Sequence, residues 1–266
     1  MNIGLVYPTN RQGVDSLKSE VISALESFQV SVVDQIDDIS IADVDFVITI
    51  GGDGTVLKAV SYMTGKQVPI MAINLGHLGY LTEVEPVNVL SSIKNLINGE
   101  FNLERRMILR AGVRRNQGME IQGLTALNDV VIEKIEPGKT IRFKLFINEA
   151  YFESYSADGI VICTPTGSTA YNLSIQGPIV APDLDAVVIT PIAPHLVFDR
   201  SLVLDSSVRL KLEINGDRQA SLVVDGSVKS VLQTGDLIEV NTKKEHVELV
   251  KFKTGEYFIE KLKSKF

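Results

Sequence analysis

The chain has 266 residues, 45% of them hydrophobic and 22% charged, and a formal net charge of −7. These values are typical of a soluble globular protein with one large domain or two ordinary ones. The 26 basic residues are scattered without forming a basic stripe, which argues against nucleic-acid binding.

The sequence also argues against export and against membrane or structural-metal sites. No apolar run approaches the roughly 18 residues that cross a bilayer, and the N-terminus "MNIGLVYPTN" lacks the features of a signal peptide. A single cysteine, Cys163, excludes an internal disulfide, and the histidines show no zinc-ligand spacing. We therefore expect a cytoplasmic protein with no membrane partner and no structural metal.

Strands and helices alternate in the first part of the chain. The run "NIGLVY" predicts a strand, and apolar residues spaced by three and four predict an amphipathic helix over residues 11–28. The runs "VSVVD", "DFVITI" and "PIMAINL" predict further strands, with a helix after "GGDGT" and another at "VNVLSSIKNLING". This alternation predicts an α/β domain over residues 1–102, with a parallel, Rossmann-like sheet.

The pattern changes near residue 103. Short apolar or alternating strands follow one another, separated by turn signals such as "EPGK", "INGDR" and "QTGD". They predict an all-β domain over residues 103–250. The helix-like tail, residues 251–266, is expected to pack back on the first domain.

The stretch "TIGGDGTVLKAV", residues 49–60, places an aspartate in a glycine-rich turn between a strand and a helix. Such a turn favours an anion, because bare N–H groups and the helix dipole point at it. The carboxylate of Asp53 would repel a phosphate unless it held a bridging Mg²⁺ or accepted a proton from an attacking hydroxyl. Because the turn matches neither the Rossmann fingerprint nor a Walker A loop, it does not predict simple dinucleotide binding. Either task of the carboxylate instead predicts a phosphoryl-transfer site.

Interpretations without a ligand are also open for this region. Asp53 can instead cap the following helix, and Lys58 either reaches back to a phosphate or lies solvated at the surface. A second glycine-rich loop, "NLGHLGYL" at residues 74–81, is expected to flank the same site. There His77 either contacts a ligand or is a turn residue.

The stretch "DGIVICTPTGSTAYNLSIQGP", residues 158–178, is rich in small hydroxyl residues and contains Tyr171. Hydroxyls and an aromatic ring suit a nucleotide, although a Ser/Thr-rich loop with no ligand is the alternative. In "LNDVVIE", Asn128 and Asp129 are adjacent, so only one faces a ligand unless the strand bends or ends there. The alternative is a polar pair at the edge of the core.

These motifs, in this order, resemble those of NAD kinases of the bacterial or archaeal type over nearly the whole chain. "GGDGT" also resembles loops of 6-phosphofructokinases and of diacylglycerol and sphingosine kinases. The run "DGIVICTPTGSTAYNLSIQGPIV" followed by "PIAPHLVFDRSLVL" is much more specific. The resemblance implies transfer of a phosphoryl group from ATP or polyphosphate, with Mg²⁺ or another divalent cation, to the 2′-hydroxyl of the adenosine ribose of NAD.

The resemblance also implies roles for individual residues. Asp53 would be the catalytic proton acceptor, with Gly54 and Lys58 beside the phosphates. Asn128 and Asp129 would hold ribose hydroxyls. The remaining cofactor-binding residues implied by the family are Lys139, Ser156, Asp158, Thr169, Ala170, Tyr171, Asn172, Leu173, Ser174 and Ala193. Ser156 stands where several family members have a basic residue.

The family further implies a homodimer or homotetramer with sites near subunit contacts, so that His195 would serve a neighbouring subunit. Two other functions are considered. A lipid kinase of the diacylglycerol or sphingosine type needs an apolar or basic membrane-facing patch, and the sequence offers no clear one. A non-catalytic dinucleotide sensor keeps the hydroxyl-rich loop but gives no reason for Asp53.

Overall fold

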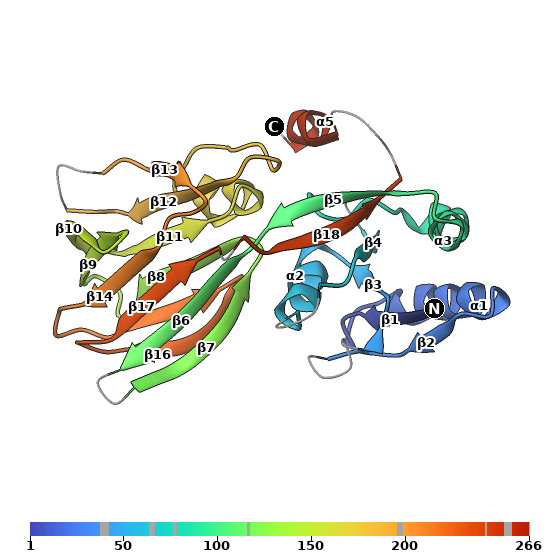
Figure 1. The fold of residues 1–266 in the computed structure, drawn as a ribbon, viewed down its shortest axis with the longest axis horizontal. Helices are drawn as coiled ribbons and strands as arrows, with labels where there is room; N and C mark the ends of the chain where they lie inside the picture. Colours follow the sequence, from blue (N-terminus) through green and yellow to red (C-terminus); the bar gives the residue numbers. More distant parts are fainter. Residues whose placement is uncertain are drawn as a thin grey trace. The chain divides into compact units, whose positions relative to one another are not determined.

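The computed structural model describes residues 1–37, 43–63, 67–76, 79–115, 118–195, 199–242, 244–252 and 257–265. The chain forms two compact units, the first made of residues 1–106 and 246–266 and the second of residues 107–245 (Figure 1). His77 lies outside the described residues, so its expected place beside the ligand stays a prediction.

The first unit is built on a six-stranded sheet in the order β2-β1-β3-β4-β18-β5. Its strands are β1 (Asn2–Val6), β2 (Ser31–Val33), β3 (Phe46–Gly51), β4 (Ile70–Asn74), β5 (Asn102–Met107) and β18 (His246–Lys251). β1 to β4 pair in parallel, and β18 pairs in parallel with β4. The loops after β1, β3 and β4 therefore leave the same edge of the sheet.

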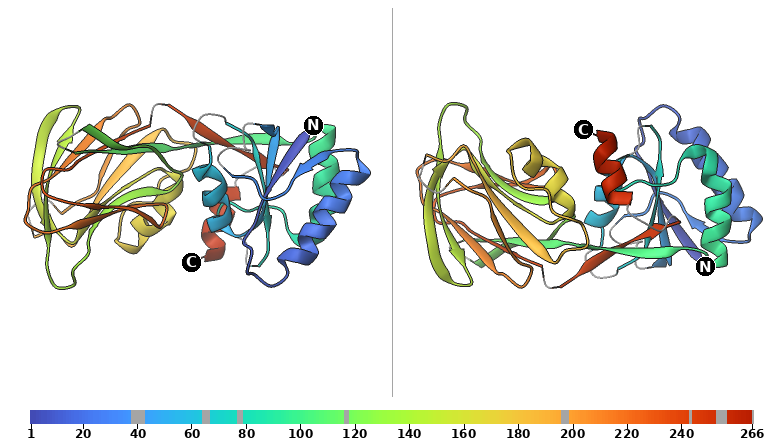
Figure 2. Two further views of the ribbon diagram at one scale, coloured as in Figure 1. Left: turned by 90° about the horizontal axis from the view of Figure 1, so that it is seen from below. Right: turned by 90° about the horizontal axis from the view of Figure 1, so that it is seen from above.

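Helices cover both faces of this sheet. Figure 2 shows α1 (Val14–Ser27) and α3 (Val89–Asn98) on one face and α2 (Asp53–Ser61) on the other. Apolar residues of α1 and α3 recur at helical spacing and are buried with residues of β1, β3 and β4 in one cluster. The short helix η2 (Pro86–Asn88) precedes α3, and α5 (Tyr257–Lys265) ends the described chain.

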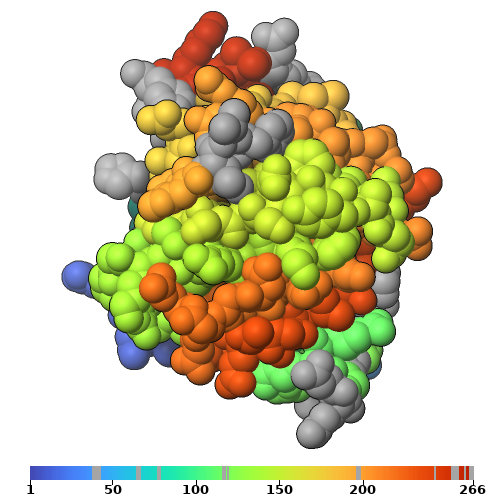
Figure 3. Space-filling model, turned by 90° about the vertical axis from the view of Figure 1, so that its left-hand side faces the viewer, coloured from blue at the N-terminus to red at the C-terminus, as the bar shows by residue number. Residues whose placement is uncertain are grey.

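The second unit consists of two antiparallel six-stranded sheets that share one apolar core. The first has the order β10-β9-β14-β17-β6-β7 and the second β13-β12-β11-β8-β15-β16. The first comprises β6 (Leu109–Arg115), β7 (Gly118–Ala126), β9 (Ile141–Ile147), β10 (Ala150–Ala157), β14 (Leu210–Ile214) and β17 (Leu237–Asn241). Its outer face is seen in Figure 3, where β9 and β10 (yellow-green) lie beside β14 and β17 (orange).

The second of these sheets carries the hydroxyl-rich segment. Its strands are β8 (Asp129–Lys134), β11 (Gly159–Cys163), β12 (Ala186–Ile192), β13 (Leu202–Asp205), β15 (Ala220–Val224) and β16 (Ser227–Leu232). Two short helices, η3 (Thr166–Thr169) and α4 (Tyr171–Ser174), follow β11 and pack against it.

One strand lies in a different unit from the one the sequence indicated. The alternation of "HVELVKF" predicts a strand in the all-β domain ending at residue 250, but β18 joins the sheet of the first unit. The ammonium of Lys251 lies 3.1 Å from a carboxylate oxygen of Glu83 and 3.4 Å from one of Glu104. These buried ionic contacts anchor β18 there, and alternation alone does not reveal such a partner. Helix α5 belongs to the same unit as β18.

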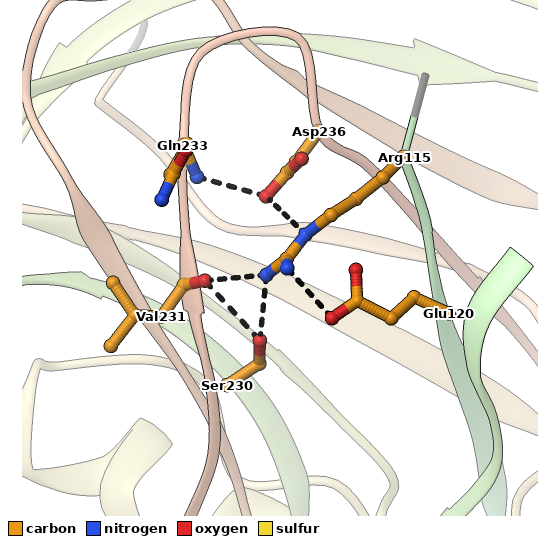
Figure 4. A network of polar contacts seen from close by, with 6 residues as sticks. All are labelled: Arg115, Glu120, Ser230, Val231, Gln233 and Asp236. Atoms are coloured by element: carbon orange, nitrogen blue, oxygen red, sulfur yellow. Dashed lines mark hydrogen bonds and ion pairs between the residues drawn. The ribbon is translucent and has the colours of Figure 1, made fainter. Parts of the chain in front are cut away.

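The two sheets of the second unit are joined by polar contacts of Arg115 at the end of β6 (Figure 4). Its guanidinium lies 2.7 Å from the Glu120 carboxylate, 3.3 Å from that of Asp236, and 2.8 Å from the carbonyl oxygen of Val231 on β16. Asp236 is only 5% exposed and also accepts the N–H of Gln233. Arg115 therefore compensates a buried carboxylate while linking both sheets.

We expect Arg115→Ala to lower the free energy of unfolding by about 1.5–3 kcal/mol, because it removes several charge-assisted hydrogen bonds. Arg114→Ala is the matched control: Arg114 lies next to it and, among the described residues, forms one ion pair, with the half-exposed Glu239 at 3.2 Å. The control should cost less than about 1 kcal/mol. Urea unfolding of both variants measures the difference, and equal losses would contradict the role assigned to Arg115.

Candidate active site

Asp53 is the first residue of α2 and follows the N-cap residue Gly52. Its carboxylate does not cap the helix. Oδ2 accepts the backbone N–H of Tyr80 at 2.8 Å, and Oδ1 accepts those of Leu81 and Thr82 at 3.0 and 3.3 Å. The helix-capping alternative is therefore wrong, and the aspartate binds the second glycine-rich loop instead.

The loop approaches Asp53 so closely that Gly79 cannot carry a side chain. A Cβ built at Gly79 would lie 2.0 Å from Oδ1 of Asp53. An ionised carboxylate offers about four acceptor positions, two on each oxygen. Among the described residues Oδ1 accepts two hydrogen bonds and Oδ2 one, so Oδ2 retains a position for one further donor. Asp53 is half-buried, so the residue is not sealed from solvent.

Gly54 and Lys58 are exposed on the same helix, four residues apart, and so lie on one face. A Cβ at Gly54 would meet nothing within 4 Å. Lys58 has no carboxylate within ion-pair distance in the part of the chain that the structure describes. The exposed face of α2 therefore combines bare backbone at the helix N-terminus with a cation about one turn further along, which suits a phosphate.

In the second unit, a carboxylate also holds the Asn128–Asp129 pair. Asp225, which follows β15, accepts the backbone N–H groups of Leu127, Asn128 and Asp129 at 2.8, 2.8 and 3.0 Å. Asp225 has a φ of +47° and Gly226 a φ of +74°, values of a tight hairpin turn. The strand β8 begins only at Asp129, so strand alternation does not apply to Asn128.

The two carboxylates differ in their surroundings. Asp129 is 5% exposed, and burial together with the negative charge of Asp225 raises its pKa to about 7. Burial also raises the pKa of Asp225, and its three backbone N–H bonds oppose that shift. Because only Asp225 receives those bonds, it is the better site for the charge, and Asp129 is the better site for a proton near neutral pH.

The hydroxyl-rich segment packs directly on this pair. The Thr164 hydroxyl donates to the carbonyl oxygen of Leu127 at 2.6 Å, and the Thr164 N–H donates to that of Asn128 at 2.9 Å. A Cβ at Gly167 would lie 2.1 Å from the same Asn128 oxygen, so only glycine fits there. These contacts bring the two motifs together in the second unit.

Within the predicted dinucleotide-lining segment, Asn172 differs from its neighbours. It is fully buried, donating to the carbonyl oxygens of Ser168 and Pro178 and accepting from the Thr190 hydroxyl at 2.7 Å. Its side chain therefore shapes the turn rather than facing a ligand. The other predicted lining residues are partly or fully exposed, namely Thr169, Ala170, Tyr171, Leu173 and Ser174.

A second group of predicted residues gathers at the opposite end of β11. Asp158 forms a 2.7 Å ion pair with Lys134, and the Ser156 hydroxyl lies 2.9 Å from that of Thr140. The backbone carbonyl oxygen of Ser156 accepts the backbone N–H of His195 at 2.9 Å. Ala193 follows β12 with a φ of +43°. The carbonyl oxygen of Ile192, just before it, accepts the backbone N–H of Asp158.

Tyr171, the first residue of α4, is exposed. Its pKa is raised by burial and then by the negative charges of Glu133, Asp129 and Asp158. The two groups of predicted residues lie at opposite ends of β11, and a five-residue strand spans about 17 Å. Lys139, next to the Thr140 that contacts Ser156, forms a 2.7 Å ion pair with Glu136 in the turn before β9.

Sequence reasoning missed several of these residues. Asp225 was visible only as part of a turn signal, "DG", and nothing in the sequence indicates which backbone segment it binds. The Lys134 contact with Asp158 follows from the pairing of β8 with β11, which sequence alone leaves undetermined. Asp53, Gly54 and Lys58 lie in the first unit, and the predicted residues from Asn128 to Ala193 lie in the second.

Among the described residues, no helix is long and apolar enough to cross a membrane.

Comparison with known proteins gives matches along most of the chain. The family model of the ATP-NAD kinase N-terminal domain matches residues 5–101, and that of the C-terminal domain matches residues 127–252. The NAD kinase of Caldanaerobacter subterraneus subsp. tengcongensis is 39% identical over 80% of this chain and 76% of its own length. That of Syntrophotalea carbinolica is 40% identical over 81% of this chain and 75% of its own.

Solved structures resemble the whole chain. Yeast NADH kinase complexed with NADH superposes with a TM-score of 0.89 at 25% identity, covering 99% of this chain and 86% of the yeast chain. An NAD kinase from Archaeoglobus fulgidus in complex with ATP shares the fold, with a TM-score of 0.80 at 24% identity and coverages of 99% and 98%. With both family models and relatives of this similarity, the chain belongs to the NAD kinase family.

Proposed function

We propose that this protein is an NAD kinase, which transfers the γ-phosphoryl group of ATP, or a phosphoryl group of polyphosphate, to the 2′-hydroxyl of the adenosine ribose of NAD, making NADP. The observation that carries the proposal is the Asp53 carboxylate, held at the start of α2 with an acceptor position open on Oδ2. The carboxylate also fixes residues 80–82, but a site that only bound phosphate would need no acceptor position open to a hydroxyl.

In the proposed reaction Asp53 is the general base. A ribose hydroxyl is a poor nucleophile, so it needs a nearby acceptor for its proton and a phosphorus held in line. The proton passes from the 2′-hydroxyl to Oδ2 of Asp53. The 2′-oxygen forms the new bond to phosphorus, and the bond to the bridging oxygen of the donor breaks, releasing ADP or a shortened polyphosphate.

The remaining groups at this turn neutralise charge. The backbone N–H groups at the start of α2 and the ammonium of Lys58 suit the donor's phosphates. No cluster of three or more His, Cys, Asp or Glu side chains that could hold a metal lies among the described residues. A divalent cation would therefore be held mainly by phosphate oxygens, where it supplies charge neutralisation.

The second unit would hold NAD. Asn128 and Asp129 suit ribose hydroxyls, because their backbone is fixed by Asp225 and by the Thr164 turn. The exposed Tyr171 and Ser174 would line the dinucleotide, with Ser156, Asp158 and Ala193 at the far end. Lys139 is proposed as a contact for an anionic group of NAD, and it would have to exchange Glu136 for that group.

Other features stay proposals supported by sequence alone. They are the cytoplasmic location, the homodimeric or homotetrameric state with His195 at a neighbouring subunit, and the divalent-cation requirement. The Rossmann-like description of the first sheet is supported by the parallel pairing of β1 to β4.

We expect Asp53→Asn to lower kcat by about 100-fold or more, because it removes the proton acceptor while keeping the size of the side chain. Formation of NADP, detected with an NADP-specific dehydrogenase, measures the loss. The amide nitrogen of asparagine cannot accept the backbone N–H groups that one carboxylate oxygen accepts, so the substitution can also disturb the loop. The melting temperature and the NAD affinity of the variant are measured to detect such a disturbance.

The matched control for a disturbed loop is Thr82→Val. The Thr82 hydroxyl accepts the N–H of Gly79 at 3.0 Å, so this variant perturbs the same loop and leaves the carboxylate in place. It should retain most of the turnover. Near-normal kcat in Asp53→Asn would show that the base is another group, and an equal loss in Thr82→Val would assign the effect to the loop.

The raised pKa of Asp129 predicts a pH-dependent stability. Its pKa is about 7 in the folded state and close to the ordinary aspartate value of 3.8 when unfolded, so between these values the folded state binds the proton more strongly. Stability therefore falls as pH rises through this window and levels off above about pH 7. Asp129→Asn carries no such proton and should gain stability relative to the wild type over the same window.

Free energies of unfolding in urea at about pH 5, 6, 7 and 8 measure this difference. Asp217→Asn, at an exposed position of the same unit, controls for the general effect of removing one negative charge. A difference between Asp129→Asn and the wild type that stayed constant across the series would contradict a buried proton on Asp129.

A further inference from the structure

Arg11 lies in the loop between β1 and α1, at the sheet edge that carries Asp53. In the sheet, β3 lies between β1 and β4, so the loops after β1 and β4 flank the turn after β3 on either side. The loop after β1 closes on the loop after β4: a Cβ built at Gly13 would lie 3.9 Å from Leu75. Arg11 is exposed and extends from this loop.

The guanidinium of Arg11 lies over two glycines of the site. A Cβ at Gly52, the N-cap of α2, would be 3.8 Å from Nη1, and a Cβ at Gly76 would be 3.4 Å from Nη2. The two terminal nitrogens are therefore close to the backbone of both glycine-rich loops. A side chain that reaches from the loop after β1 to the loop after β4 crosses directly over the GGDGT turn.

This guanidinium has no acidic partner among the described residues. The nearest carboxylate in the site, that of Asp53, is held by three backbone N–H groups and makes no ion pair with Arg11. A guanidinium presents up to five donors in a planar fork and is always charged at neutral pH. Its donors are therefore available to an anion that enters above the glycines.

We propose that Arg11 binds the terminal phosphates of the phosphoryl donor. This inference rests on the proposed kinase function and adds a binding residue to it. The guanidinium fork matches the oxygens of a phosphate chain, and the absence of a side chain at Gly52 lets that chain lie beside the fork at the start of α2. Charge on the transferred phosphoryl group is then met by Arg11 from one side and by the backbone N–H groups and Lys58 from the other.

The test compares steady-state kinetics of Arg11→Gln, Arg11→Lys and the wild type. Loss of a charge-assisted phosphate contact should raise KM for ATP about 10- to 100-fold in Arg11→Gln, with KM for NAD unchanged. Arg11→Lys should recover part of the affinity, since it restores the charge without the fork. Gln12→Ala, in the same loop and equally exposed, is the matched control and should leave both KM values unchanged.

Inorganic tripolyphosphate serves as a probe of the phosphates alone. As a competitor of ATP, it should lose affinity in Arg11→Gln by the same factor as ATP does. If KM for ATP rose while the inhibition constant for tripolyphosphate stayed the same, Arg11 would contact another part of the nucleotide and the proposal would fall. Polyphosphate as donor should show the same sensitivity to Arg11→Gln wherever it supports turnover.

The two hypotheses fail in different ways. Wild-type protein that made no NADP from ATP or polyphosphate would overturn the kinase function, while tripolyphosphate binding, measured by calorimetry, would still test Arg11. Wild-type activity with an unchanged KM for ATP in Arg11→Gln would overturn the role of Arg11 alone. An equal rise in the KM values for ATP and NAD would also overturn it, because that would indicate a general disturbance of the loop.

Discussion

Both parts of the candidate site depend on one interaction, an aspartate carboxylate that accepts three consecutive backbone N–H groups. Asp53 holds residues 80–82 in the first unit, and Asp225 holds residues 127–129 in the second. A loop fixed in this way has its polar backbone satisfied without regular secondary structure. It can therefore bring glycines and short polar side chains to a sheet edge in a defined position.

The same interaction has different consequences because the neighbours of the two carboxylates differ. Both are half-buried, and Asp53 keeps one acceptor position that suits a substrate proton. Asp225 has the buried Asp129 beside it, and its charge makes a second negative charge there costly. In the first unit the bound loop therefore leaves Asp53 with an acceptor position for a proton. In the second unit the charge of Asp225 shifts Asp129 toward its protonated form.

The sequence predicts the alternation of strands and helices well, because 3.6-residue and two-residue periods are local properties. It also predicts that GGDGT and the hydroxyl-rich segment carry chemistry. It fails where partners are distant in the chain: β18 joins the first sheet through Lys251, and Asp225 binds a segment about a hundred residues earlier. Asn172 matches the family motif, yet its burial shows a structural task that residue type alone does not reveal.

The glycines of GGDGT separate what the fold needs from what a ligand needs. A Cβ at Gly51 would lie 2.1 Å from the Thr55 hydroxyl, so packing alone accounts for that glycine. A Cβ at Gly54 would meet nothing within 4 Å, and glycine inside a helix costs about 1 kcal/mol relative to alanine. Stability alone would favour a side chain at Gly54. Its absence is explained if a phosphate chain approaches the backbone of α2 on the exposed face that Gly54 shares with Lys58.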